Sequence, residues 1–103
     1  MRYLSDINIL YKQLNDLNYD VKLIPMLGIE GTLLVNIVEH LMTKNNNEII
    51  VIRLKTLCEL LNCHHSKVYS ILNTVIQSYT PLNIEKFKLD EEGLVTILFQ
   101  KIL

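Results

Sequence analysis

The stretch that most constrains the fold is residues 57–76, LCELLNCHHSKVYSILNTVI. Its apolar residues recur at spacings of three and four, as they do on the buried face of a helix. A tight turn is predicted at Asn62-Cys63, because Asn tolerates the left-handed backbone needed to leave a helix sharply. The sequence therefore predicts two helices joined by this turn. The inward residues of the first helix are Leu54, Leu57, Cys58, Leu60 and Leu61, and those of the second are Val68, Ile71, Leu72, Val75 and Ile76.

The side chains left facing outward near the start of the second helix can donate, accept or stack. A helix-turn-helix offers this part of its second helix to nucleic acid. We therefore predict nucleic-acid contacts on this helix, and we expect Lys86 and Lys88 of a later strand to contact phosphates. The predicted helix contacts are His64, His65, Lys67, Tyr69, Ser70 and Asn73.

Further elements are predicted on both sides of this motif. A first helix, capped by the Ser5 hydroxyl, extends to about residue 18. Its apolar stripe is expected to pack within the chain rather than on another copy, because a small domain needs that area. Pro25 and Gly28 interrupt the chain before a second helix at 29–43, and β-branched residues predict a strand at 48–52. Strands at 82–89 and 94–101 are joined by a turn in which Gly93 supplies a positive φ. The apolar stripe consists of Leu4, Ile7, Leu10, Tyr11, Leu14 and Leu17.

The order helix, strand, helix, turn, helix and β-hairpin resembles a winged helix, and TLCELLNCHHSKVYSILNTVI resembles the helix-turn-helix of bacterial winged-helix proteins. The resemblance covers residues 28–101. The segment LGIEGTLLVNIVEHL also resembles winged-helix domains of replication-initiation and primosome proteins from low-G+C bacteria, plasmids and phages. The resemblance implies one α+β domain over 1–103, a winged helix-turn-helix with an additional N-terminal helix at 1–20. It also implies non-catalytic DNA binding in replication, recombination or repair, in the context of a mobile element.

Charge argues against ordinary duplex binding. Ten Lys and Arg residues against eleven Asp and Glu residues give a net charge of −1, whereas proteins that hold duplex DNA through its phosphates tend to be basic. Where related families often carry Arg or Lys, this chain has His64 and His65, which are mostly neutral at pH 7. The carboxylates of Asp90, Glu91 and Glu92 at the hairpin turn would also be repelled by phosphate. Single-stranded DNA is therefore slightly favoured as the partner, because exposed aromatic rings stack on unpaired bases.

Two alternatives to single-strand binding stay open. One is a transcriptional regulator that binds a specific duplex site. The other is a protein-interaction module of a replication complex, with self-association or replication proteins as its partners. If the cations gather on one face, nucleic acid is favoured, and if acidic residues lie between them, protein docking is favoured. These cations are Arg53, Lys55, Lys67, Lys86, Lys88 and Lys101. The rings among them are Tyr69 and Tyr79, with Tyr69 expected to be exposed, and Phe87 and Phe99, which are expected in the core.

Other functional classes are disfavoured by the sequence. Cys58 and Cys63 are interpreted as small buried hydrophobic residues. With His64 and His65 they form a cluster whose chemistry suits zinc, but its spacing matches no common zinc motif, so no metal or cofactor is expected. The sequence has no glycine-rich phosphate loop and no nucleophile elbow, so no enzymatic activity is predicted. No apolar run approaches the roughly 18–20 residues that span a bilayer, and no signal peptide is recognised. A cytoplasmic location without membrane contact is therefore expected.

Overall fold

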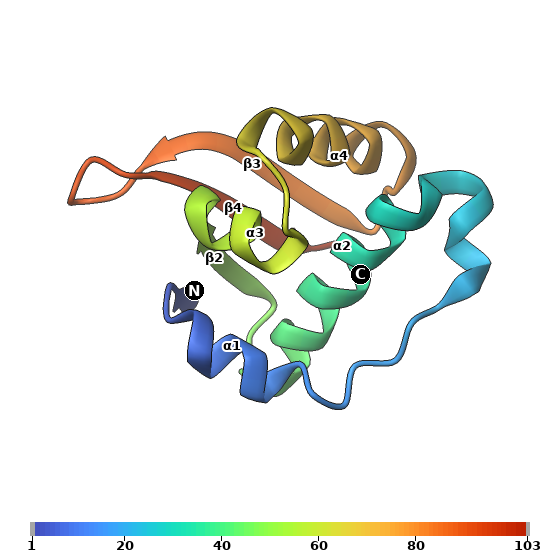
Figure 1. The fold of residues 1–103 in the computed structure, drawn as a ribbon, viewed down its shortest axis with the longest axis horizontal. Helices are drawn as coiled ribbons and strands as arrows, with labels where there is room; N and C mark the ends of the chain where they lie inside the picture. Colours follow the sequence, from blue (N-terminus) through green and yellow to red (C-terminus); the bar gives the residue numbers. More distant parts are fainter. Residues whose placement is uncertain (1, 103) are drawn as a thin grey trace.

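Four α-helices and four strands build an α+β domain over residues 2–102, the range described by this computed structural model (Figure 1). Within that range, the side chains of Phe87 and Lys88 lie outside the description. The elements in chain order are β1 (Arg2–Leu4), α1 (Ile7–Gln13), the short 3₁₀ helix η1 (Val21–Leu23), α2 (Ile24–Lys44), β2 (Ile49–Arg53), α3 (Leu54–Leu61), α4 (His65–Ser78), β3 (Leu82–Leu89) and β4 (Val95–Lys101).

The strands form one mixed sheet in the order β1-β2-β4-β3. β1 pairs in parallel with β2, and β4 pairs antiparallel with both β2 and β3. Because side chains alternate between the two faces of a strand, Ile50 and Ile52 point to one face, while Val51 and Arg53 point to the other. Ile50 and Ile52 are fully buried in a core that they share with α2, α3 and α4. The three helices therefore cover one face of the sheet.

The apolar core is centred on α2. Leu34, Val35, Val38 and Leu41 have no exposed surface, and they recur at the spacing of one helix face. By length and composition alone the segment Val21–Lys44 could cross a membrane, which the sequence analysis did not expect. In this domain its apolar face instead packs against the sheet and the other helices.

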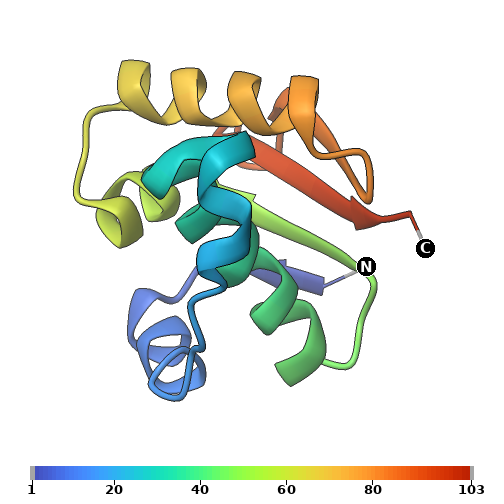
Figure 2. The ribbon, with the colours of Figure 1, turned by 90° about the vertical axis from the view of Figure 1, so that its right-hand side faces the viewer.

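α4 crosses over the N-terminal half of α2 (Figure 2). Gly31 lies at this crossing, where an added Cβ would meet Leu27 Cβ at 3.1 Å and Val75 Cγ2 at 3.6 Å. A side chain at Gly31 would therefore be crowded by Leu27 of α2 itself, whereas Val75 of α4 lies at an ordinary van der Waals distance. Gly28, three residues earlier, has a non-helical backbone with a φ of 74° and a ψ of 174°, and it divides α2 at a kink into two helical segments.

The predicted order of elements from residue 24 onward is confirmed, with β2 and β4 within one residue of their predicted starts. The predicted interruption at Gly28 is confirmed by its non-helical backbone, and the helix predicted from residue 29 follows this kink. The prediction missed the segment of α2 before the kink, where Pro25 lies in the first helical turn and its missing N–H costs nothing. The N-terminus differs more. It begins with β1, which was not predicted. The backbone is therefore in the extended conformation of a strand up to Leu4. The Asp6 carboxylate rather than Ser5 then caps α1, accepting from the Asn8 N–H at 3.0 Å.

α1 ends at Gln13 rather than near residue 18. Its apolar stripe packs within the chain as predicted. Leu4 and Leu10 are buried, and Leu14 and Leu17 pack against the core. Tyr11 is the exception, because 53% of its surface is exposed.

The β3–β4 hairpin is bent near its middle. The register shifts between Glu85 and Lys88, which marks a β-bulge, and a bulge bends the strand that carries it. The loop beyond the bulge is closed by the Asp90 carboxylate, which accepts from the N–H groups of Glu92 and Leu94 at 2.9 Å each. Gly93 has a φ of 78°, as the sequence predicted.

Candidate nucleic-acid interface

The turn between α3 and α4 is built as predicted. Asn62 adopts the left-handed conformation, with a φ of 51°. Its N–H donates to the Glu59 carbonyl at 3.3 Å, and the Cys63 N–H donates to the Cys58 carbonyl at 3.1 Å. These two bonds are those of a Schellman motif, which satisfies the last carbonyls of a helix. The motif fixes where α4 begins.

Two adjacent imidazoles, whose ring planes are tilted by 38°, mark the start of α4. His64 is the N-cap, and its Nδ1 accepts from the Ser66 N–H at 3.4 Å. The ring centroids of His64 and His65 lie 3.9 Å apart. Both side chains are exposed, as predicted for residues that contact a ligand.

The outward face of α4 carries short polar side chains. Ser70 and Asn73 are exposed, because the inward face of the helix is occupied by buried residues that pack on α2, α3 and β3. Tyr69 lies between the two faces and was expected to be exposed. It is half-buried and packs against the core. Its ring lies edge-on to the His65 ring, with 6.0 Å between the two ring centroids. The buried residues of α4 are Val68, Ile71, Leu72 and Val75.

The hairpin contributes a cation to one flank of α4. Lys86 of β3 donates from Nζ to the Asn73 side-chain oxygen. This contact joins the helix and the hairpin into one polar surface, which we call the α4 surface: His65, Tyr69, Ser70, Asn73 and Lys86. Lys88 belongs to β3, but its side chain is outside the described residues, so its predicted phosphate contact is not assessed.

On the other flank of α4, a carboxylate of α2 pairs with a predicted contact residue. Lys67 Nζ lies 3.0 Å from Glu30 Oε1, and both side chains are 52% exposed. Nothing in the sequence indicates Glu30 at this position, because the kinked start of α2 brings it to α4. Lys67 therefore lies on the predicted face of α4, but its positive charge is partly neutralised by Glu30.

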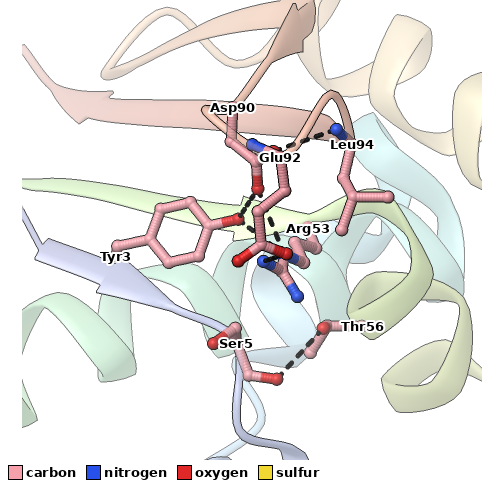
Figure 3. Close-up of polar contacts among 7 residues, drawn as sticks. All are labelled: Tyr3, Ser5, Arg53, Thr56, Asp90, Glu92 and Leu94. Atoms are coloured by element: carbon pink, nitrogen blue, oxygen red, sulfur yellow. Dashed lines mark hydrogen bonds and ion pairs between the residues drawn. The ribbon is translucent and has the colours of Figure 1, made fainter.

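Arg53 and the acidic hairpin loop meet on the opposite face of the sheet (Figure 3). The Arg53 guanidinium donates to Glu92 at 3.0 Å and to Asp90 at 3.3 Å. It also donates to the Tyr3 hydroxyl at 2.7 Å, and that hydroxyl donates in turn to Asp90. We call these four side chains the hairpin clamp. The carboxylates of Asp90, Glu91 and Glu92 were all expected to repel phosphate at the hairpin turn, but the Asp90 side chain is only 12% exposed and pairs with Arg53.

The clamp changes the acidity of its members. The Tyr3 hydroxyl, followed by the Leu94 N–H, holds the pKa of Asp90 down at about 2. Burial and the hydrogen bond to Asp90 raise the pKa of Tyr3, and the bond to Tyr3 raises that of Arg53. A cavity of about 560 Å³ lies beneath the loop, and Val51 and Leu98 are among its lining residues.

The predicted aromatic rings do not gather on the α4 surface. Phe99 is fully buried in the core, as expected. Tyr79 is half-buried, and its hydroxyl donates to Glu39 of α2 at 3.0 Å. Burial, followed by this bond, raises the pKa of Tyr79 to about 12. The side chain of Phe87 is outside the described residues. Of the rings assessed, Tyr69 is therefore the one beside the outward face of α4.

Cys58 and Cys63, which were predicted to be small buried residues, hold free thiols and pack against the core, but they are half-buried. Burial raises the pKa of both thiols, and the neighbouring Cys63 raises that of Cys58 further. Over the described part of the chain, the structure contains no group of three or more His, Cys, Asp or Glu side chains placed to hold a metal ion.

Comparison of the chain with protein-family models, with curated proteins and with solved structures gives no match.

Proposed function

We propose that this chain is a winged-helix protein that binds DNA through the α4 surface. The order of its elements supports the proposal. After β1 and α1, the chain continues as α2, β2, α3, α4 and the β3–β4 hairpin, with β2, β4 and β3 as an antiparallel sheet. α3 and α4 occupy the positions of a helix-turn-helix, in which the second helix enters the major groove.

The observation that carries the proposal is the contact between Lys86 and Asn73. It places a cation of the hairpin beside the exposed polar side chains of α4. Phosphate contacts position a protein on DNA, and short polar side chains can then contact base edges. In this arrangement Lys86 contacts a phosphate, and Ser70 and Asn73 face the bases.

The hairpin clamp weakens one argument against DNA binding. Carboxylates at a wing tip repel phosphate, and the sequence carries three of them. Asp90 and Glu92 are instead paired with Arg53 on the sheet face opposite to the helices. Because their charge is partly compensated and directed away from α4, they oppose DNA at the α4 surface less than the sequence implied.

The proposal covers both single- and double-stranded DNA, because one observation favours a single strand and another favours a duplex. Tyr69 with His65 can stack on an unpaired base of a single strand. Phe99 is buried in the core and Tyr79 is bonded to Glu39, so fewer rings are available for stacking than the sequence suggested. The helix face with Ser70 and Asn73 suits a groove. The ratio of the dissociation constants for single- and double-stranded DNA decides which form is preferred.

The direct test is fluorescence anisotropy with matched single- and double-stranded oligonucleotides at two salt concentrations. We expect binding in the range of about 10⁻⁶–10⁻⁴ M, weakened by salt. The double substitution S70E/N73E should reduce affinity for the preferred form at least about tenfold, and K86A should lower the salt slope by about 1. N15E/N18E, at two exposed residues after α1, adds the same two charges as S70E/N73E, and K101A at the far end of β4 removes the same charge as K86A, so these are the charge-matched controls. Unchanged anisotropy with both oligonucleotides at low salt would refute DNA binding.

A second candidate function, protein docking, is favoured by carboxylates that lie between the cations. Glu30 pairs with Lys67, and Asp90 and Glu92 pair with Arg53. An apolar corner before and within α2 is also exposed, with Val21 at 63% and Ile29 at 68%. If the chain binds no DNA, light scattering over a range of concentrations should then show a mass above that of the monomer, and I29D should abolish it. A monomer at every concentration would contradict docking between copies.

A further inference from the structure

Cys58 and Cys63 lie at the two ends of the turn between α3 and α4. The Cys63 N–H donates to the Cys58 carbonyl at 3.1 Å. Between these two residues, the Asn62 N–H donates to the Glu59 carbonyl at 3.3 Å. In a Schellman motif, the residues at the two outer positions commonly bring their side chains into contact. The motif therefore places the two cysteines as neighbours, although four residues separate them in the chain.

The geometry of this turn is compatible with a covalent bridge. With standard bond lengths, the 3.1 Å hydrogen bond limits the distance between the two Cα atoms to about 7 Å. Disulfides usually join Cα atoms about 4.4–6.8 Å apart. Both thiols are free and half-buried, so a small reagent can reach them without unfolding of the core.

We propose that Cys58 and Cys63 are a reversible dithiol–disulfide pair, oxidised by a small-molecule disulfide such as glutathione disulfide. One cysteine thiolate attacks a glutathione sulfur, which forms a mixed disulfide and releases one glutathione thiolate. The second cysteine thiolate then attacks the protein sulfur of the mixed disulfide, closes the Cys58–Cys63 bond and releases a second glutathione. The protein gives up two protons and two electrons, and glutathione disulfide is reduced to two thiols.

The surroundings of the pair set the rate of this reaction. Thiolate is the attacking form, and burial raises the pKa of both thiols. The bridge therefore forms slowly near pH 7 and faster at alkaline pH. Once formed, it ties the end of α3 to the residue that precedes His64, the N-cap of α4. This inference goes beyond the proposed function, because it concerns the α3–α4 turn whatever α4 contacts.

The test uses the full chain, incubated with glutathione disulfide at pH 7 and pH 8.5, alkylated and analysed by intact mass and peptide mapping. We expect the monomer to lose two hydrogens, with a peptide that joins residues 58 and 63, faster at pH 8.5 and reversed by dithiothreitol. C58S and C63S should each stop at a stable mixed disulfide with glutathione. The bridged form should melt a few degrees higher, because the bridge restricts the unfolded chain.

Three results would overturn the pair. They are two glutathione adducts on one chain, a disulfide between two chains in place of the internal bridge, and unreacted cysteines in the folded chain when guanidinium-unfolded chain reacts under the same conditions. Each is read on the wild-type chain, so the outcome does not depend on whether the serine variants fold. None depends on DNA binding, so failure of the bridge and failure of the proposed function are separately visible.

Discussion

Arg53, at the end of β2, donates to Glu92 in the hairpin loop at 3.0 Å and ties the tip of the hairpin back to the sheet. Tyr3 of β1 completes the tie, because its hydroxyl accepts from Arg53 and donates to Asp90. The apolar residue at the end of β3, Leu89, is 67% exposed and adds little packing. Polar contacts therefore set the direction of the hairpin beyond its bulge.

Removal of the guanidinium should release the hairpin loop. In R53A, Asp90 loses a cation and Tyr3 loses its donor, so we expect Tm to fall by about 5 °C. Hydrogen exchange should accelerate at the amides of Glu92 and Leu94, which are bonded to Asp90. K55A, which removes a neighbouring exposed charge of α3, should leave both readouts unchanged. Equal exchange in R53A and K55A would show that the clamp does not hold the loop.

Acid should open the same clamp. In the folded chain Asp90 has a pKa of about 2, held down first by Tyr3 and then by the Leu94 N–H, whereas an unfolded Asp titrates near pH 3.9. A folded pKa below the unfolded one stabilises the fold above about pH 4, and this stabilisation is lost as pH falls toward 2. Wild type should therefore melt higher than D90N at pH 6, and the difference in Tm should close by pH 2.

A second carboxylate provides the control for this pH dependence. Asp16 also has a pKa of about 2, held down first by Lys44 and then by His40, but it lies outside the clamp. D16N should lose its own share of acid sensitivity while the exchange of the Leu94 amide stays slow at neutral pH. A gap between wild type and D90N that stays constant from pH 6 to pH 2 would contradict the role given to Asp90.

The helices could be predicted from sequence because their signals are local. Apolar spacing indicated the buried face of α4, and Asn62 indicated the turn before it. Ile76 was predicted on that face but is 41% exposed, because it lies in the last turn of α4. The clamp could not be predicted, because β1 is a three-residue strand without alternation and its parallel partner β2 is distant in the chain. The pairing of Lys67 with Glu30 was missed for the same reason. Both contacts follow from how distant segments pack, which a single sequence does not reveal.

The turn residue itself can be tested through its backbone. Asn62 has a φ of 51°, and alanine pays about 1–2 kcal/mol to adopt the left-handed conformation, whereas glycine adopts it without this cost. We expect N62A to lower the free energy of unfolding by about 1 kcal/mol and N62G to be neutral or stabilising. Denaturant unfolding measures both.

A matched position separates backbone strain from an effect on α4. Asn46, in the turn after α2, has a φ of 50°, so N46A should lose similar stability. In the anisotropy assay, N62A should weaken oligonucleotide binding and N46A should not, because Asn62 sets the start of α4. Equal stability of N62A and N62G would contradict the strain argument.

The last prediction concerns the pair that holds Lys67. Glu30 shares the charge of Lys67 at 3.0 Å, and its own charge repels phosphate beside α4. In E30Q, Lys67 becomes available to a phosphate, so we expect affinity for DNA to rise about three- to tenfold with a steeper salt slope. Because both side chains are half exposed, the pair adds little to stability, and Tm should change by no more than a few degrees.

E48Q is the control, because it changes the net charge equally at an exposed residue before β2. An equal gain in E30Q and E48Q would show that net charge alone sets the affinity, and a loss of affinity in E30Q would place the DNA contact away from Lys67.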